Sequence, residues 1–433
     1  MKKKQMLSLV GIGLAVALAL SGCSAPAESG GTVTLQMVES LTNPVRTKVI
    51  KGLLADFEKA NPKIKVDLIS PPTDQADQKI QQMLQSGSGV DVVEVRDITV
   101  GPFSTNGWLA DMSGELKGWK GWDDLTANAT KYATNAKGKT YYVPYGFYGL
   151  SLFYRTDLVK EAGFDGPPAS WTDLLKQATA LQDPSKNQFG YAFRGGTNAN
   201  SNVVVAIEAY VAKKLDHDNA FKLTNGKTIF SAPEAADALK TYFTLFSKAS
   251  PPSSVAWGYP EMVQGFSSGT TAFLLQDPEV IATVGESDAI TTAQWSTAPL
   301  LAGPSGIAVQ PMATAGWGTA AKSSHKAEAA KLIEFLSEGK ASTTFSQKNS
   351  LVPILKSAAD SSFYKTGAWA SYLTMTENPD KYVSVVQPRD SSWWSEWIQK
   401  SDSEVQKVLI GQMTQKELLA SWDSYWTAKW KTK

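Results

Sequence analysis

Few residue patterns in this sequence could support catalysis. Gly265-Phe266-Ser267-Ser268-Gly269 fits G-x-S-x-G, the pattern of a serine nucleophile on a sharp turn. That turn needs a strand before the serine and a helix after it, whereas residues 260–265 look helical and residues 271–275 are rich in β-formers. His217 and His325, the two histidines, stand in hydrophilic stretches without an evident partner. We therefore expect no serine–histidine catalysis.

Other enzyme signatures are also missing. The sequence has no His-Glu-x-x-His zinc motif and no Gly-x-x-x-x-Gly-Lys phosphate loop, and its one thiol is Cys23 near the N-terminus. We expect no catalytic residue, no metal and no cofactor. A glycosidase stays open as an alternative, because it needs only two carboxylates at a set separation and the chain has 41 Asp and Glu.

Polar residues follow three strands that the hydrophobic pattern predicts near the N-terminus. We expect strands at 32–38, 64–68 and 90–95, with helices near 49–57 and 75–84 between them. A β-α-β-α-β order implies a parallel sheet with right-handed crossovers. Ligands bind beyond the carboxyl ends of such strands, which here carry Glu39-Ser40, Ser70-Pro71 and Arg96-Asp97.

The rest of the chain alternates in the same way. Residues 141–154 should be extended, with Pro144 keeping their first part at a sheet edge, and Ser170 should cap the next helix. Further predicted elements are strands at 189–193 and 270–275, a helix at 232–249, a strand and helix within 313–337, and a mostly helical final ninety residues.

Length and composition restrict the class of protein. A chain of 433 residues exceeds the usual size of one hydrophobic core, so two domains are expected. Without residues 1–22 the chain has 39 basic and 41 acidic residues, a net charge of −2 that leaves no basic surface for nucleic acid. The 14 tryptophans suit core packing, but several lie beside Gly, Pro or Ser, where stacking on a flat ligand is the alternative role.

The N-terminus has the layout of an export signal. Lys2 to Lys4 precede an apolar run, Leu7 to Leu20, that is too short for a comfortable membrane span. Leu20-Ser21-Gly22-Cys23 resembles a bacterial lipobox, which implies cleavage after residue 22 and lipidation of Cys23. Residues 23–31 would then form a lipidated tether, and the protein would be extracytoplasmic and anchored to the cell membrane.

Four blocks, in this order, resemble the family 1 extracellular solute-binding proteins, the sugar-binding lipoproteins of bacterial ABC importers. The blocks are VDVVEVRD from Val90, GKTYYVPYGFYGLSLFYRTDLVKEAGFDGPPASWTDLL from Gly138, GTTAFLL from Gly269 and GWGTAAKSSHKAEAAKLIEFLS from Gly316. Each block is a loose match, and the blocks are spread along the chain from Val90 to Ser337.

The resemblance implies an α/β, two-domain, periplasmic-binding-protein-like fold (type II), with the ligand in a cleft between domains joined by crossing hinge strands. By analogy, the N-terminal domain comprises residues 32–143 and 298–340, and the C-terminal domain comprises 144–297 and 341–433. It also implies hinge closure around a sugar or oligosaccharide, delivery to the permease subunits of an ABC transporter, and a monomer.

A sugar has apolar C–H faces and a rim of hydroxyls, so its site needs aromatic platforms with charged or amide groups around them. The expected hydrogen-bonding residues are Glu39, Asp97, Asn198, Asp277 and Arg389, and the expected stacking residues are Tyr145, Phe147, Trp257, Trp317 and Trp393. Helix capping, solvated charge and core packing are the alternative roles for these side chains.

A non-sugar ligand in the same fold also stays open. A polyamine would need cleft carboxylates around aromatic rings, which this chain could supply. An anion would need clustered arginines, and few arginines fall in the candidate loops. A peptide is the remaining alternative.

Overall fold

The first elements of the chain form the predicted β-α-β-α-β unit. The computed structural model describes residues 31–42, 44–135, 137–359, 361–389 and 391–431. The unit consists of β1 (Val33–Val38), α1 (Pro44–Ala60), β2 (Ile64–Ile69), α2 (Thr73–Ser86) and β3 (Val92–Arg96). β1 pairs in parallel with both β2 and β3. The predicted export signal and Cys23 lie outside the described residues.

A strand from far along the chain completes this first sheet. Its order is β2-β1-β3-β10-β4, and β10 (Ala313–Thr319) runs antiparallel to both β3 and β4 (Val143–Tyr148). Pro144 lies in the edge strand β4, as predicted. A Cβ on Gly316 would lie 2.0 Å from the Val143 carbonyl oxygen, so β10 fits between its neighbours only without a side chain there.

A second sheet of four strands has the order β6-β7-β5-β8. The strands are β5 (Ser151–Arg155), β6 (Phe189–Tyr191), β7 (Thr271–Gln276) and β8 (Trp295–Ala298). Helices α6 (Trp171–Ala180), α7 (Asn200–Val211) and α8 (Pro233–Ala249) pack beside it around a large apolar core. Ser170 caps α6 as predicted, because its side chain accepts a hydrogen bond from the Asp173 N–H.

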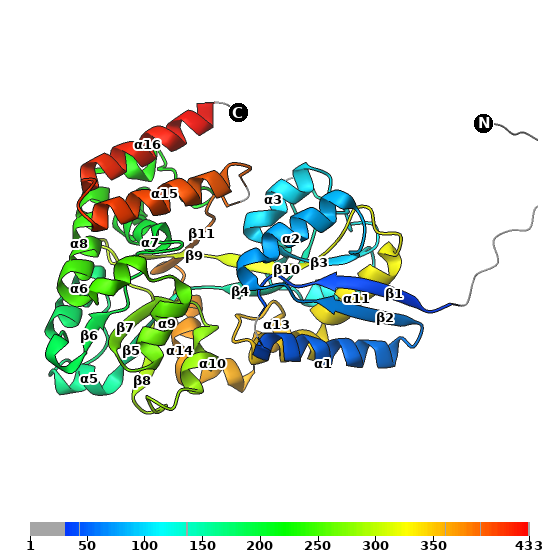
Figure 1. Cartoon of the computed structure of the whole chain (residues 1–433), viewed down its shortest axis with the longest axis horizontal. Coiled ribbons are helices and arrows are strands. Elements are labelled where there is room, and N and C mark those ends of the chain that lie inside the picture. Colours follow the sequence, from blue (N-terminus) through cyan, green and yellow to red (C-terminus); the bar gives the residue numbers. More distant parts are fainter. Residues whose placement is uncertain (1–30, 43, 136, 360, 390, 432–433) are drawn as a thin grey trace, which may run out of the picture.

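The two sheets belong to two lobes, which Figure 1 shows side by side. The chain passes from the first lobe to the second between β4 and β5, and it returns between β9 (Ala308–Pro311) and β10. β9 pairs in parallel with β11 (Tyr382–Val385), a strand that the sequence did not indicate within the helical C-terminal part. The crossing strands β4, β9 and β10 therefore connect the lobes, as in the predicted fold class.

The packing of α12 (Gly339–Lys348) indicates a later end of the first lobe than the resemblance implied. α12 packs on α1 and on α11 (Lys326–Ser337), both of the first lobe. Phe345 and Leu351 join Val143 and Trp317 in one apolar cluster. This packing favours a first lobe that continues to about residue 358, where the resemblance implied residue 340.

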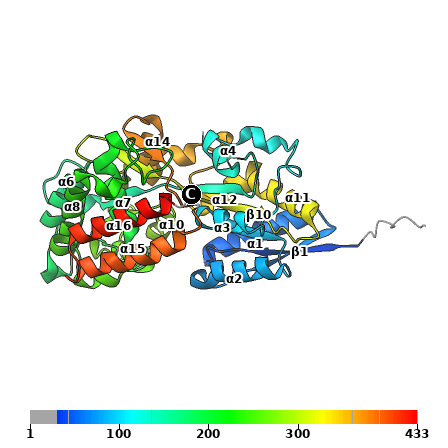
Figure 2. The ribbon, with the colours of Figure 1, turned by 90° about the horizontal axis from the view of Figure 1, so that it is seen from above.

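The remaining helices complete both lobes. They are α3 (Asp97–Thr105), α4 (Ala127–Ala133), α5 (Thr156–Glu161), α9 (Tyr259–Ser267), α10 (Val280–Gly285), α13 (Lys356–Ala359), α14 (Ala370–Glu377), α15 (Trp394–Leu409) and α16 (Gln415–Lys431). Figure 2 shows α15 and α16 together along one side of the second lobe, away from α14. In the described part of the chain, none of the helices combines the length and apolar character that crossing a membrane requires.

Candidate functional site

A buried ion-pair network holds the carboxyl ends of β1 and β3 together. The Arg46 guanidinium of α1 lies 2.8 Å from Glu39 Oε2 and 2.8 Å from Glu94 Oε1, and all three side chains are at most 1 % exposed. Glu39 also accepts hydrogen bonds from the hydroxyls of Thr47 and Ser70. The structure therefore uses Glu39, an expected ligand-binding residue, to fix the end of β1.

Tyr145 and Tyr148 extend this network along β4. The Tyr145 hydroxyl donates to Glu94 Oε1 at 2.5 Å and lies 2.9 Å from the Tyr148 hydroxyl. The Tyr145 ring packs against Trp317 and Phe345 with centroid distances of 5.2 and 4.8 Å. Tyr145 was expected to stack on a ligand, but its ring lies in the core of the first lobe.

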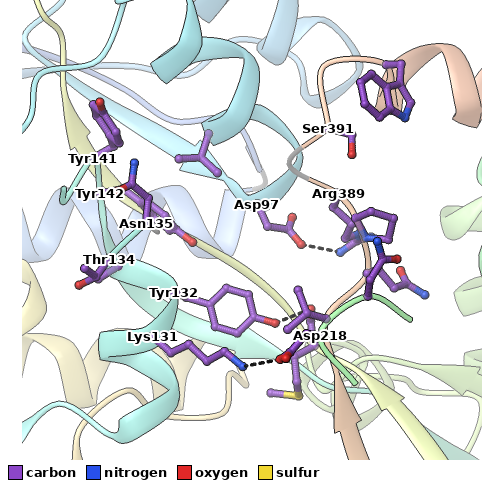
Figure 3. Close-up of a pocket in the computed structure, with 18 of the residues that line it drawn as sticks. Asp97, Lys131, Tyr132, Thr134, Asn135, Tyr141, Tyr142, Asp218, Arg389 and Ser391 are labelled. Atoms are coloured by element: carbon purple, nitrogen blue, oxygen red, sulfur yellow. Dashed lines mark hydrogen bonds and ion pairs between the residues drawn. The ribbon is translucent and has the colours of Figure 1, made fainter. Parts of the chain in front are cut away.

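A cavity of about 390 Å³ lies between the lobes (Figure 3). Asp97, Arg389 and Trp393, three of the ten expected site residues, line it. Arg389 Nη1 donates to Asp97 Oδ2 at 2.7 Å across the lobe interface, and Figure 3 shows the two groups pointing at each other. The lining also includes rings, amides and a second ion pair that sequence reasoning missed: Tyr132, Tyr141, Tyr142, Trp430, Asn135, Asn219, Gln387, Lys131 and Asp218.

Several of these lining residues were not predicted, because the sequence around each of them contains no feature that indicates a binding role. Tyr132 lies on α4, and its hydroxyl donates to the Met312 carbonyl, between β9 and β10, at 3.3 Å. Only the fold brings these two segments together. Gln387 lies two residues before Arg389, so its position could have been inferred from that neighbour.

Removing the charge of Arg389 should shift the lobes toward an open arrangement. Asp97 belongs to α3 of the first lobe and Arg389 to the second, so their ion pair forms only when the lobes are close. We expect Arg389→Gln to increase the mean distance between spin labels placed on the two lobes. Lys65→Gln, which removes an exposed ion pair within the first lobe, should leave that distance unchanged. Equal distances in both variants would contradict the role of the pair.

A second group of charged side chains lies at the carboxyl ends of β6 and β7. Asp277 Oδ1 accepts from the Glu279 N–H at 3.1 Å, and burial raises the pKa of both carboxyls. Burial lowers the pKa of Arg194, while Asp402 and Asp277 oppose that change. After burial and Asp277, the charges of Arg46 and Glu94 in the first lobe also influence the pKa of Glu279. Glu279 was missed although it lies two residues after Asp277.

The other expected residues lie elsewhere. Asn198 adopts a positive φ of 58°, and its N–H donates to Asp402 Oδ2 at the start of α7. Phe147 and Trp317 are 2 % and 1 % exposed. Trp257 packs with its ring against Gly265. None of these four lines the cavity, and the rings of Phe147, Trp257 and Trp317 pack with the cores of the two lobes instead.

Glu208 should make the stability of the protein depend on pH. It is fully buried on α7, its Oε1 accepts from Gln387 Nε2 at 2.8 Å, and burial raises its pKa to about 8. The unfolded carboxyl titrates near 4.5, so this contribution to the unfolding free energy is present below that pH and is lost as the pH rises to about 8. The unfolding free energy of the unmodified protein should therefore fall between these two pH values. In Glu208→Gln we expect this fall to be smaller by about 2–5 kcal/mol, as measured by urea unfolding at both pH values.

The matched control for this pH effect is Glu115→Gln, which changes an exposed carboxylate of the first lobe. In this control variant the unfolding free energy should depend on pH in the same way as in the unmodified protein. If Glu208→Gln behaves in the same way as this control, Glu208 is not the group that responds.

The structure agrees with the expectation about the G-x-S-x-G pattern. Ser267 is the last residue of α9, and β7 begins four residues later, so a helix precedes the serine and a strand follows it. This is the reverse of the order that a nucleophile elbow requires. Among the described residues, no group of three or more His, Cys, Asp or Glu could hold a metal ion.

Comparison with solved structures supports the same architecture. The maltose-bound MalE3 of T. maritima matches with a TM-score of 0.78 at 20% identity, covering 91% of this chain and 99% of that one. A solute-binding protein of Agrobacterium vitis S4 with bound D-mannitol matches with a TM-score of 0.76 at 20% identity, covering 93% and 99%.

Sequence relatives include two further proteins. An uncharacterized lipoprotein of Streptomyces antibioticus is 23% identical over 74% of this chain and 70% of its own length. The mannitol-binding protein of Pseudomonas aeruginosa is 25% identical over 50% of this chain and 49% of its own length. The family model described as "Bacterial extracellular solute-binding protein" matches residues 43–341. With two lobes joined by crossing strands and that match over more than half of its length, the chain belongs to the bacterial extracellular solute-binding proteins.

Proposed function

We propose that this protein captures a sugar, oligosaccharide or sugar alcohol between its lobes and delivers it to an ABC importer. The observation that carries the proposal is the interlobe cavity, which combines aromatic rings with carboxylate, amide and guanidinium groups. Its volume of about 390 Å³ lies within the range of small-molecule sites. The rings suit the C–H faces of a sugar, and the polar groups suit its hydroxyls.

The similar proteins support the same class of solute. Maltose and D-mannitol are bound in the two structures described above, and both compounds carry many hydroxyls. The Asp97–Arg389 ion pair joins the two lobes at the cavity, so closure of the lobes would form this pair beside the bound solute. A transporter could then distinguish the closed receptor from the open one. In this proposal the chain has no catalytic residue and acts as a monomer.

We further propose that Cys23 carries the lipid that keeps this receptor at the outer face of a membrane. The lipobox-like run Leu20 to Cys23 supports the anchor, and so does the lipoprotein among the relatives. Mass spectrometry of the N-terminal peptide would test it. A diacylglyceryl group on Cys23 is the expected result, and an unmodified thiol would contradict the anchor.

The test of the proposed function is a titration of the purified full chain, kept in a detergent without a sugar headgroup. A panel of mono-, di- and trisaccharides and sugar alcohols, including maltose and D-mannitol, would be followed by tryptophan fluorescence and calorimetry. Saturable binding of one structural class, with the compound recovered intact, is expected. A cleaved compound would indicate a hydrolase, and no binding across the panel would contradict the sugar assignment.

A cationic solute such as a polyamine is the second candidate, and one observation favours it. In the described part of the chain, Asp277 and Glu279 have no Lys, Arg or His partner within ion-pair distance, although burial raises the pKa of both. A bound amine could supply the missing positive charge. Spermidine and putrescine therefore belong in the same titration as a separate arm.

A further inference from the structure

A continuous chain of hydrogen bonds leads from the buried arginine of the first lobe to the edge that faces the second lobe. It runs from Arg46 through Glu94 and Tyr145 to Tyr148, the last residue of β4. Arg46, Glu94 and Tyr145 are buried, whereas Tyr148 is partly exposed. The order of donors and acceptors along this chain decides what Tyr148 can offer to a solute.

Glu94 receives hydrogen bonds on both of its oxygens. Arg46 Nη2 and the Tyr145 hydroxyl donate to Oε1 at 2.8 and 2.5 Å. The N–H groups of Ser40 and Leu41 donate to Oε2 at 2.6 and 3.3 Å. A carboxylate paired with a guanidinium only accepts hydrogen bonds. The single hydroxyl proton of Tyr145 is therefore committed to Glu94.

The direction of the next hydrogen bond follows from this. Arg46 Nη2 also donates to the Tyr145 oxygen at 3.1 Å, and the Tyr148 hydroxyl lies 2.9 Å from that oxygen. Since Tyr145 has no second proton, Tyr148 must be the donor. Burial raises the pKa of both phenols well above its usual value, so both keep their protons at neutral pH. The Tyr148 oxygen then has only lone pairs left to offer.

Tyr148 lies outside the lining of the interlobe cavity, at the end of β4 next to the region where a solute would be held. Tyr148 pairs with Ala313, and Ala315 pairs with both Gly146 and Arg96, which places Tyr148 at the same sheet edge as Asp97. The two strands are separated by β10, so this edge is about 10 Å wide between them. Glu279 of the second lobe also influences the pKa of Tyr148, after burial and Tyr145. Tyr148 also directly precedes the crossing to β5, so it lies at the end of the first sheet next to the second lobe.

We propose that Glu94 and Tyr145 are positioning residues that fix Tyr148 as a hydrogen-bond acceptor, so that a bound solute must present a hydroxyl or amino donor to it. The inference rests on the proposed function and adds a rule of specificity to it. Replacing the hydroxyl of the solute at this position with a group that cannot donate leaves the Tyr148 lone pair unpaired in a closed site. Such a loss is costly for binding.

The binding test uses the panel sugar or sugar alcohol that binds most tightly, together with its mono-deoxyfluoro derivatives. Fluorine is close to a hydroxyl in size but cannot donate. For one ring or chain position we expect the derivative to bind the unmodified protein about tenfold more weakly than the parent compound. In Tyr145→Phe the Tyr148 proton becomes free to point at the fluorine. The ratio of the affinity for the parent compound to that for the derivative should then fall to about twofold. In Tyr148→Phe the ratio at that position should approach one.

The control is Tyr364→Phe, which removes another buried tyrosine hydroxyl, bonded to Ser346 Oγ at 3.1 Å and not part of the hydrogen-bond chain from Arg46 to Tyr148. It should keep the tenfold ratio. If a panel compound binds but Tyr145→Phe and Tyr148→Phe leave every ratio unchanged, the specificity rule is wrong and the proposed function stands. If no panel compound binds, it is the proposed function that fails.

A measurement without solute tests the hydrogen-bond direction separately. With selectively labelled tyrosine, the hydroxyl proton of Tyr148 should give a slowly exchanging NMR signal with a nuclear Overhauser effect to the Tyr145 ring. Tyr145→Phe should lose that signal to exchange with water, while the Tyr364→Phe protein should keep it. A Tyr148 hydroxyl proton in fast exchange in the unmodified protein would overturn the inference whether or not a sugar binds.

Discussion

A protein carrying Glu94→Ala is expected to be less stable than the unmodified protein by about 3–5 kcal/mol. The substitution removes one of the two carboxylate partners of the buried Arg46 guanidinium. Arg46 is 1 % exposed, and Glu94 supplies one of its two carboxylates. The substitution also removes the acceptor of the Ser40 N–H and of the Tyr145 hydroxyl. Equilibrium unfolding in urea would measure the difference from the shift in midpoint at an unchanged slope.

Glu58→Ala is the matched control for this result. Glu58 also forms an ion pair at 2.9 Å, with Lys65, but its side chain is 25 % exposed and that of Lys65 is 50 % exposed. Exposed pairs contribute about 0–1 kcal/mol, so this variant should unfold close to the unmodified protein. Similar losses of unfolding free energy in Glu94→Ala and Glu58→Ala would show that burial does not determine how much the Arg46 network stabilises the protein.

Trp397→Ala is expected to have an effect of similar size, about 3–5 kcal/mol, for a different reason. The Trp397 ring is fully buried between α15, α16 and the segment before α8. Its centroid lies 5.0 Å from that of Trp422, 5.4 Å from Trp426, and 5.6 and 5.7 Å from Phe221 and Phe230. Truncation would leave a cavity in this aromatic cluster, and urea unfolding would measure the cost.

The position of α15 adds a second expected effect of this substitution. α15 begins directly after Trp393, and Arg389 and Trp393 both line the interlobe cavity. Loosening α15 should therefore also weaken binding of whichever panel compound binds. Trp430→Ala, which truncates a half-buried ring in the last turn of α16, should cost much less stability. Equal losses of unfolding free energy in Trp397→Ala and Trp430→Ala would contradict the importance of the aromatic cluster.

The hydrophobic pattern predicted most of the individual helices and strands because they are local, whereas the two lobes were expected from the chain length and from the family resemblance. Residues 33–96 alternate so regularly that all five elements of the first unit were expected with small errors at their ends. The positions of β9 and β11 were not predicted, because each has only four residues and is defined by pairing with the other. The packing of α12 on α1 is likewise a tertiary effect that no local sequence pattern predicts.

The candidate site was predicted less completely than the fold. Asp97 and Arg389 could be proposed from sequence, Asp97 because it follows a strand and Arg389 because a guanidinium can donate hydrogen bonds to sugar hydroxyls. The sequence could not reveal that they pair with each other across the lobes. Tyr145 and Phe147 were misplaced because an aromatic strand has the same composition whether its rings face a ligand or a core. Burial and hydrogen-bond partners distinguish these roles, and both depend on the complete fold.

Strand β10 fills the space between β3 and β4, and β4 has no other partner in its sheet. During synthesis that space stays open until all four strands of the second sheet have been made, since β8 ends at Ala298 and β10 begins at Ala313. A nascent chain therefore cannot complete its first sheet before all four strands of its second sheet have been made, and a fragment ending ahead of β10 would have two bare strand edges prone to aggregation. Such a delay would leave the first sheet incomplete until about three quarters of the chain has been synthesised.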